Sequence, residues 1–219
     1  MVFSNNLLMG AASSTGGDVA AGWVPKGAIW LDGVSDYLKF TPGSTTGNKK
    51  FTFSCWLKGN PEANSTVLDA ATGPFNSTNR SSITLEDNGF LDFLSDVSNV
   101  RVIDLHTVQY FKDPSAWFHL VLVLDTTVAT PNGNSIAYFI NGTQVTNLDA
   151  STYPAQNVVT QFFTSGTQMN IGVNNYNNTA SYALFSGYMS EVIMLDSYAG
   201  RASDFGTENS DGVWIPKDP

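Results

Sequence analysis

Apolar and polar side chains alternate with a period of two along most of this chain, and this pattern most constrains its fold. In the segment KFTFSCWLK the apolar residues that share one face are Phe51, Phe53, Cys55 and Leu57. Such alternation is typical of a half-buried β-strand. No long stretch repeats with the 3.6-residue period of an amphipathic helix. We therefore expect an all-β fold.

Two turn signals divide the alternating segments into hairpins. Asn88-Gly89 interrupts ITLEDNGFLDFL, and Asn141-Gly142 interrupts IAYFINGTQVTNL. Asn-Gly between alternating segments is a strong hairpin signal, because both residues tolerate a positive φ. The nearly continuous apolar run in AWFHLVLVLD predicts a central strand covered on both faces. The segment FSGYMSEVIMLDS predicts a late strand. Polar loops are expected at 60–81, 126–135, 150–168 and 174–183.

The composition limits the classes of partner. The chain has 219 residues, with 10 Lys and Arg against 19 Asp and Glu, which gives a formal net charge of −9. A surface of this charge repels nucleic acid, so we expect no nucleic-acid partner. No apolar run approaches the roughly 18 residues of a membrane span, so no membrane insertion is expected. Cys55 is the only cysteine, and its place within a strand predicts a buried thiol.

Four segments in order carry a family resemblance: AIWLDGVSDYLKF, FTFSCWLK, WFHLVLVLD followed by IAYFINGTQV, and GYMSEVIMLDSYA leading into SDF. Over residues 27–206 the chain resembles laminin-G-like, concanavalin A-type jelly rolls. The resemblance implies an antiparallel two-sheet jelly-roll sandwich, preceded by a short N-terminal arm. It does not fix the function, because this fold occurs in lectins, glycanases, lyases and adhesion modules.

Both ends of the chain resemble segments of tailed, especially marine, bacteriophage virion proteins. The segments are NNLLMGAASSTGG at the start and DFGTENSDGVWIPKDP at the end. This resemblance implies a virion structural protein, such as a capsid decoration, a fibre or a tail appendage. It would assemble in the host cytoplasm and lie on the particle surface. We expect it to form a homo-oligomer and to touch host-surface glycans. The alternative is a free or cell-surface carbohydrate-binding module.

The N-terminal segment is a candidate docking element. Its apolar residues are Phe3, Leu7, Leu8 and Met9, and a run of small and polar residues follows them. We predict an arm and flexible tether over residues 1–22 and the sandwich over 23–219. The arm would dock into capsid or tail proteins, although so short a segment is also compatible with folding over its own sandwich.

The segment VNNYNNTASYALF is a candidate glycan-binding loop. Its aromatic faces suit sugar stacking, and its side-chain amides supply paired donors and acceptors. The residues concerned are Asn174, Asn175, Tyr176, Asn177, Asn178 and Tyr182. The alternative is a solvated loop tip, since Asn-rich loops are usually turns.

The carboxylates show no catalytic spacing. Glycan hydrolysis needs two carboxyl groups that face each other across a cleft. In this fold they usually come from one strand as Glu-x-Asp-x-x-Glu, which does not occur here. Glu86 and Asp87 are adjacent and are expected to point apart, and Asp92 and Asp96 flank a different strand end. We therefore expect no catalytic residues, and a glycanase or lyase is the less favoured alternative.

Metal binding is left open by the sequence. A structural calcium would draw on Asp32, Asp36 and Asp196, which lie at strand ends. The favoured interpretation is that Asp32 and Asp36 cap the turn between them, so no cofactor is expected. His106 and His119 have no companion ligands at metal spacing, and we interpret both as packing or hydrogen-bonding residues.

Overall fold

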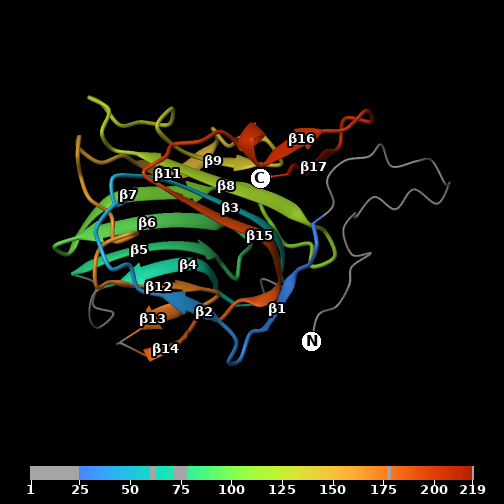
Figure 1. The fold of residues 1–219 in the computed structure, drawn as a ribbon, viewed down its shortest axis with the longest axis horizontal. Helices are drawn as coiled ribbons and strands as arrows, with labels where there is room; N and C mark the ends of the chain where they lie inside the picture. Colours follow the sequence, from blue (N-terminus) through green and yellow to red (C-terminus); the bar gives the residue numbers. More distant parts are fainter. Residues whose placement is uncertain (1–24, 60–62, 72–77, 177–178, 219) are drawn as a thin grey trace.

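The computed structural model contains two large β-sheets and describes all residues except 1–24, 60–62, 72–77, 177–178 and 219 (Figure 1). In spatial order, the six-stranded sheet consists of β1 Ile29–Asp32, β15 Ser186–Asp196, β3 Lys50–Gly59, β8 Phe118–Asp125, β9 Ile136–Ile140 and β10 Thr143–Gln144. The seven-stranded sheet consists of β11 Leu148–Thr152, β7 Val100–Thr107, β6 Leu91–Val97, β5 Asn79–Leu85, β4 Ser65–Ala71, β12 Gln168–Ile171 and β2 Leu38–Phe40.

The remaining elements are short. They are the pair β13 Asn174–Tyr176 and β14 Thr179–Tyr182, the pair β16 Gly206–Glu208 and β17 Trp214–Pro216, and the 3-10 helix η1 Ala202–Asp204. Neighbouring strands run antiparallel throughout the described residues. The all-β, two-sheet antiparallel architecture predicted from the sequence is therefore confirmed.

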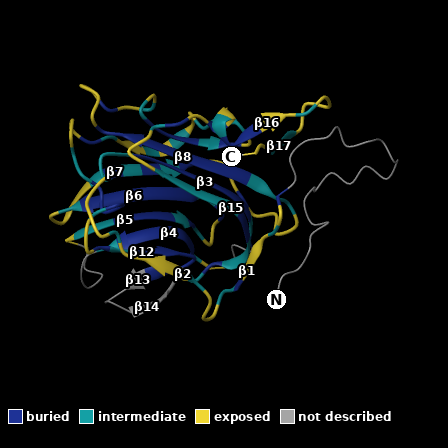
Figure 2. Ribbon diagram, in the orientation of Figure 1, coloured by how far each residue is buried: buried dark blue, intermediate teal, exposed yellow. Residues whose placement is uncertain are grey.

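The core lies between the two sheets and follows the predicted alternation. Phe51, Phe53, Cys55 and Leu57 on β3 are all 0% exposed and belong to one apolar cluster with residues of the opposite sheet, such as Phe93. Figure 2 shows the central strands of both sheets as buried. Burying a large apolar side chain contributes about 1.5–3 kcal/mol, so these strands hold the sandwich together.

The outer face of the six-stranded sheet is covered by the C-terminal segment. Val121 and Val123 of β8 form a second apolar cluster with Ala202 and Phe205, against which Trp214 packs. β8 is thus covered on both faces, as predicted from its continuous apolar run.

His119 of β8 joins the sheet to the C-terminal segment. The Trp214 indole Nε1 donates to His119 Nδ1 at 2.9 Å, so the ring proton lies on Nε2, which faces Ser54 Oγ at 2.8 Å. The Trp56 ring stacks on His119 with 4.9 Å between centroids. Burial lowers the pKa of His119 to about 4, so the ring is neutral at neutral pH. The predicted hydrogen-bonding role of His119 is confirmed.

Both predicted Asn-Gly hairpins are present. Asn141 and Gly142 have φ values of 47° and 80° and form the two-residue turn between β9 and β10. A β-carbon at Gly142 would lie 2.5 Å from the Trp214 ring, so this position requires glycine for its close approach as well as for its φ. The turn at Asn88-Gly89 joins β5 to β6.

Two of the predicted loops were wrong. The expected loop at 60–81 contains β4, whose residues are almost all buried, and the expected loop at 174–183 contains the β13–β14 hairpin. The small and polar residues of these segments resemble a loop composition. They form strands because β4 pairs with β5 and β12, and because β13 and β14 pair with each other.

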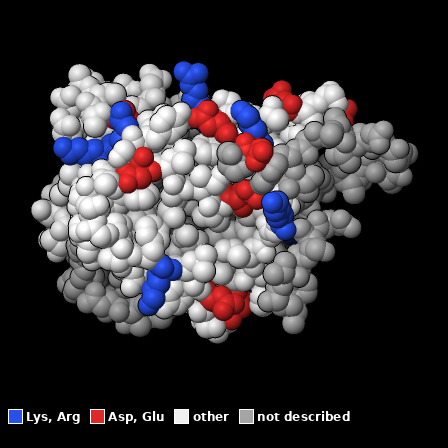
Figure 3. All heavy atoms as spheres, in the orientation of Figure 1, with Lys and Arg blue, Asp and Glu red and all other residues white. Residues whose placement is uncertain are grey.

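Two further observations concern the surface charge and membrane-spanning helices. Figure 3 shows acidic and basic side chains scattered over a mostly uncharged face. In the part of the chain that the structure describes, no helix is long and apolar enough to cross a membrane.

Candidate functional site

The outer face of the seven-stranded sheet carries polar residues. The outer face of the six-stranded sheet differs, because the C-terminal segment covers it. Leu91 and Phe93 of β6 point into the core, so the intervening Asp92 points outward. On β7, Leu105 is in the core and His106 points outward, and Asp92 and His106 are direct cross-strand partners. The pairing that completes the core therefore places an acid beside a histidine on the opposite face.

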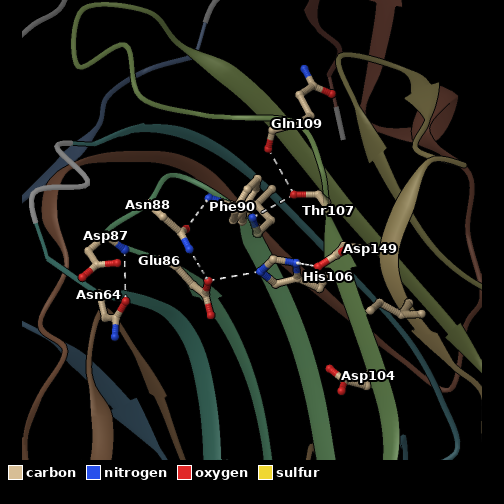
Figure 4. Close-up of polar contacts among 12 residues, drawn as sticks. Asn64, Glu86, Asp87, Asn88, Phe90, Asp104, His106, Thr107, Gln109 and Asp149 are labelled. Atoms are coloured by element: carbon tan, nitrogen blue, oxygen red, sulfur yellow. Dashed lines mark hydrogen bonds and ion pairs between the residues drawn. The ribbon is translucent and has the colours of Figure 1, made fainter.

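His106 lies between two carboxylates from neighbouring elements (Figure 4). Its Nε2 is 3.1 Å from Glu86 Oε2 in the β5–β6 turn, and its Nδ1 is 3.7 Å from Asp149 Oδ2 on β11. With Asp92 and Asp104, these residues form what we call the acidic cluster: Glu86, Asp92, Asp104, His106 and Asp149.

The β5–β6 turn holds the Glu86 carboxylate in place. The Glu86 backbone N–H donates to the Phe90 carbonyl at 2.9 Å, and the Gly89 N–H donates to the Glu86 carbonyl at 2.8 Å. Gly89 has a φ of 90°, which favours glycine. The Asn88 side-chain amide donates to Glu86 Oε2 at 3.1 Å, and the Asn64 side-chain oxygen accepts from the Asp87 N–H at 3.0 Å.

Asp92 is the buried member of the acidic cluster. It is 8% exposed, and its Oδ1 has no hydrogen-bond partner among the described residues. Burial raises the pKa of the Asp92 carboxyl to about 7, and the negative charges of Asp104 and Glu86 add to the rise. Arg101 and His106 act in the opposite direction. At neutral pH this carboxyl therefore exchanges between an acceptor and a donor form.

An aromatic pair adjoins the acidic cluster. The Phe90 ring contacts His106 edge-on at 4.8 Å between centroids and the Tyr110 ring at 4.6 Å. Tyr110 is 64% exposed, and the Lys112 ammonium lies 5.9 Å from its ring centroid. An exposed ring held beside carboxylates offers an apolar surface and hydrogen-bond acceptors in one place.

A groove of about 480 Å³ lies along the end of the six-stranded sheet. Gln109, which follows β7, is one of its walls, and the Gln109 carbonyl accepts a hydrogen bond from Thr107 Oγ1 at 3.2 Å. The other polar lining residues are Asn141, Thr143, Gln144, Thr146 and Asn147. The groove thus presents amides and hydroxyls without a charged side chain.

A second cavity, of about 560 Å³, lies on the outer face of the six-stranded sheet. Phe139 and Trp214 form part of its apolar wall, and Asp125 and Arg201 supply charge. The Lys50 ammonium already pairs with Asp125 at 2.8 Å.

The predicted glycan-binding residues lie in the β13–β14 hairpin. Asn174 is 5% exposed, and its register partner is Tyr182. Asn175 and Tyr176 follow on β13, whereas Asn177 and Asn178 lie outside the described residues. Glycan contact at this hairpin stays a prediction. The same is true of docking by the N-terminal arm, because Phe3, Leu7, Leu8 and Met9 lie outside the described residues.

The turn-capping interpretation of Asp32 is confirmed. Its Oδ1 accepts from the backbone N–H groups of Val34, Ser35 and Asp36 at 2.8–3.0 Å, which lowers the pKa of Asp32 to about 2. In the described part of the chain, no group of three or more His, Cys, Asp and Glu side chains is arranged to hold a metal ion. Cys55 is buried as predicted, and burial raises the pKa of its thiol.

The acidic cluster was not predicted from the sequence, although a signal was present. Asp92 and Asp96 were expected to flank a strand end, but they lie on the same face of β6, and Asp96 pairs with Arg80 and Arg101. The segments LDFLSDV and VRVIDLHT both alternate core residues with titratable ones. Pairing them across one hairpin would have placed Asp92 and His106 together.

The sequence matches the family described as the concanavalin A-like lectin/glucanases superfamily over residues 32–198. A pentraxin from Limulus polyphemus is similar in structure, with a TM-score of 0.52, 14% identity, and coverage of 76% of this chain and 74% of that one. Domain 4 of an arabinanase from Geobacillus stearothermophilus, in complex with arabinotriose, has a TM-score of 0.51, 18% identity, and coverage of 79% and 72%.

The CBM40 of a Ruminococcus gnavus sialidase, bound to α2,6-sialyllactose, has a TM-score of 0.50, 13% identity, and coverage of 78% of this chain and 94% of that one. A search of curated proteins finds no match to the chain. At these identities the structural likeness establishes the fold alone.

The raised pKa of Asp92 predicts a specific pH dependence of stability. The folded carboxyl binds its proton more tightly than the unfolded one, whose pKa is 3.8, so the free energy of unfolding falls as the pH rises from about 4 to about 7. We expect Asp92→Asn to be more stable than the wild type by about 1–3 kcal/mol near pH 8, and by little near pH 4. Urea unfolding at both pH values measures this. Asp211→Asn, on an exposed turn, is the control, and a difference that does not depend on pH would contradict the assignment.

Proposed function

Because the chain belongs to the concanavalin A-like lectin/glucanases superfamily, we propose that it binds carbohydrate at the acidic cluster and its adjoining aromatic pair. The observation that carries this proposal is the exposed Tyr110 ring, which is held by Phe90 beside the Glu86–His106 hydrogen bond. Phe90 links the exposed ring to the cluster, since it contacts both Tyr110 and His106.

The chemistry of the site suits a sugar ring. The apolar face of a pyranose can stack on Tyr110, as sugars do on aromatic side chains. Its hydroxyls can donate to the carboxyl oxygens of Glu86 and Asp149. The neighbouring groove would take further sugar units, because its amides and hydroxyls both donate and accept hydrogen bonds. The arabinotriose of the arabinanase domain and the sialyllactose of the CBM40 show that this fold carries oligosaccharide ligands in other proteins.

The proposed role is binding without turnover. Glu86, Asp92 and Asp149 are gathered around His106 rather than set along one strand, which supports recognition over a paired acid and base. Product formation from a bound oligosaccharide would contradict this part of the proposal and favour a glycanase or lyase.

Replacing Tyr110 tests where the sugar binds. We expect Tyr110→Ala to weaken binding of a neutral oligosaccharide found on a glycan array by about tenfold, because it removes about 1–1.5 kcal/mol of stacking. Isothermal titration calorimetry measures the loss. Tyr198→Ala is the matched control, since Tyr198 is 50% exposed and lies beyond β15. Unchanged binding by Tyr110→Ala, with loss on Tyr176→Ala and Tyr182→Ala, would place the site at the β13–β14 hairpin instead.

We further propose that the sandwich is a component of a bacteriophage virion, on the strength of the terminal segments alone. In this proposal the N-terminal arm anchors the domain to a capsid or tail protein, and the sandwich presents its glycan site to the host surface. The closing DFGTENSDGVWIPKDP segment has a structural role in addition, because it supplies β16 and β17, and its Phe205 and Trp214 pack over the six-stranded sheet.

Deleting residues 1–16 tests the anchoring role. We expect the truncated chain to be absent from purified particles, because Phe3, Leu7, Leu8 and Met9 are its proposed contacts, while its circular dichroism and thermal unfolding match those of the full chain. Incorporation at the normal copy number would contradict the proposal.

A further inference from the structure

We propose that the hydrogen bond between Trp214 and His119 is an acid-sensitive latch, and that protonation of His119 releases the β16–β17 pair from the six-stranded sheet. The latch lies on the outer face opposite the candidate carbohydrate site, so it stands apart from the proposed function. Three features support it: the direction of the hydrogen bond, the way in which the pair is attached, and the close fit of the indole.

The hydrogen bond requires a neutral imidazole. An indole N–H can only donate, so His119 Nδ1, at 2.9 Å from Trp214 Nε1, must be the acceptor. The single ring proton of His119 therefore lies on Nε2, which donates to Ser54 Oγ at 2.8 Å. The latch thus depends on one protonation state of one side chain.

Protonation of His119 would act on this contact selectively. An imidazolium carries a hydrogen on both ring nitrogens, so its Nδ1–H would face the indole N–H, donor against donor. The contact with Ser54 survives, because a hydroxyl oxygen accepts from Nε2–H in either state. The stacked Trp56 ring, 4.9 Å away between centroids, accommodates a cation on its face. Acid therefore breaks the link to β17 and leaves the links to β3.

The β16–β17 pair is attached to the sandwich by side chains. In the described structure, β16 and β17 pair with each other as a separate two-stranded sheet. The hydrogen bond recorded between the described residues of this pair and the six-stranded sheet is the one from Trp214. Apolar contact supplies the rest, through Phe205 and the Trp214 ring near Val121 and Val123. The pair can therefore leave without breaking a strand pairing of the sandwich.

Two glycines make room for the indole. A β-carbon at Gly206 would overlap the Trp214 ring, and one at Gly142 would lie 2.5 Å from it. Gly142 also has a positive φ, whereas Gly206 does not. A methyl group at Gly206 would therefore displace the indole without straining the backbone, and Gly206→Ala imitates the released state at any pH.

Charged groups on the neighbouring elements do not provide the acid response. The side chains recorded against the His119 ring are uncharged, and burial is the cause that lowers its pKa. Burial and the charge of Asp218 raise the pKa of Glu191, so protonation of Glu191 holds the pair more firmly and opposes release. The titratable residues on the elements around the ring are Lys58 on the outward face of β3, Glu191 on β15, and Lys217 and Asp218 after β17.

The pKa of His119 sets the pH range of release. It is about 4 in the closed state, and exposure of the ring would return it toward 6.5. The open state then binds a proton more tightly than the closed state, so the open fraction grows as the pH falls from 6.5 to about 4. Between pH 8 and pH 5 this growth amounts to about thirtyfold.

Hydrogen-exchange mass spectrometry of the full chain tests the latch, with rates corrected for the intrinsic effect of pH. We expect the protection of residues 206–215 to fall about thirtyfold between pH 8 and pH 5, while β3 and β6 stay protected. In His119→Gln this protection should be nearly independent of pH, because the amide can accept from Trp214 and donate to Ser54 but does not titrate. Gly206→Ala should lose the protection at both pH values.

A second measurement applies if His119→Gln does not fold. NMR titration of the His119 ring should give a pKa near 4 in the wild type and nearer 6.5 in Gly206→Ala, where the displaced indole exposes the ring. Equal pKa values in the two proteins would overturn the proposal. So would unchanged protection of residues 206–215 in the wild type at pH 5, or the same pH dependence in His119→Gln. Simultaneous loss of protection in β3, β6 and β17 would also overturn it, because acid would then unfold the whole sandwich.

Discussion

The cross-strand pairing of Asp92 with His106 is the constraint on which both faces of the seven-stranded sheet depend. In this register Phe93 lies opposite Leu105, and both side chains are fully buried between the sheets. A slip of one residue would exchange the two faces, sending the carboxylate and the imidazole into the core. The free energy gained from the core therefore also fixes the position of the acidic cluster. Residues of the β5–β6 turn complete the acidic cluster, since Asn88 and Gly89 orient Glu86 toward His106.

The two outer faces of the sandwich have different roles. The C-terminal segment covers the outer face of the six-stranded sheet. Trp214 donates a hydrogen bond to the neutral ring of His119, and Phe205 packs on β8. The outer face of the seven-stranded sheet carries a carboxyl with a raised pKa and an exposed aromatic ring, and a polar groove lies along the end of the six-stranded sheet. His119 thus has a packing role, whereas His106 belongs to the candidate site. Neither histidine has companion metal ligands at a suitable spacing in the sequence.

The sequence predicted the parts of the fold in which apolar alternation is strong. The strands around Phe53 and His119, both Asn-Gly hairpins and the sandwich class are confirmed. β4 was mistaken for a loop, because small residues such as Ala70 are buried there by pairing on both sides rather than by their own hydrophobicity. The acidic cluster was missed for a related reason: its members come from a turn and three strands, and only the sheet register brings Asp149 to His106.

Carbohydrate binding at the acidic cluster can be mapped from the amide chemical-shift changes of the 15N-labelled chain as an oligosaccharide is titrated. Binding at the acidic cluster predicts that the largest changes fall at residues 86–90, 106–110 and 148–149, where the turn, β7 and β11 meet. Changes concentrated instead at the β13–β14 hairpin, or in the cavity beside Trp214, would contradict it.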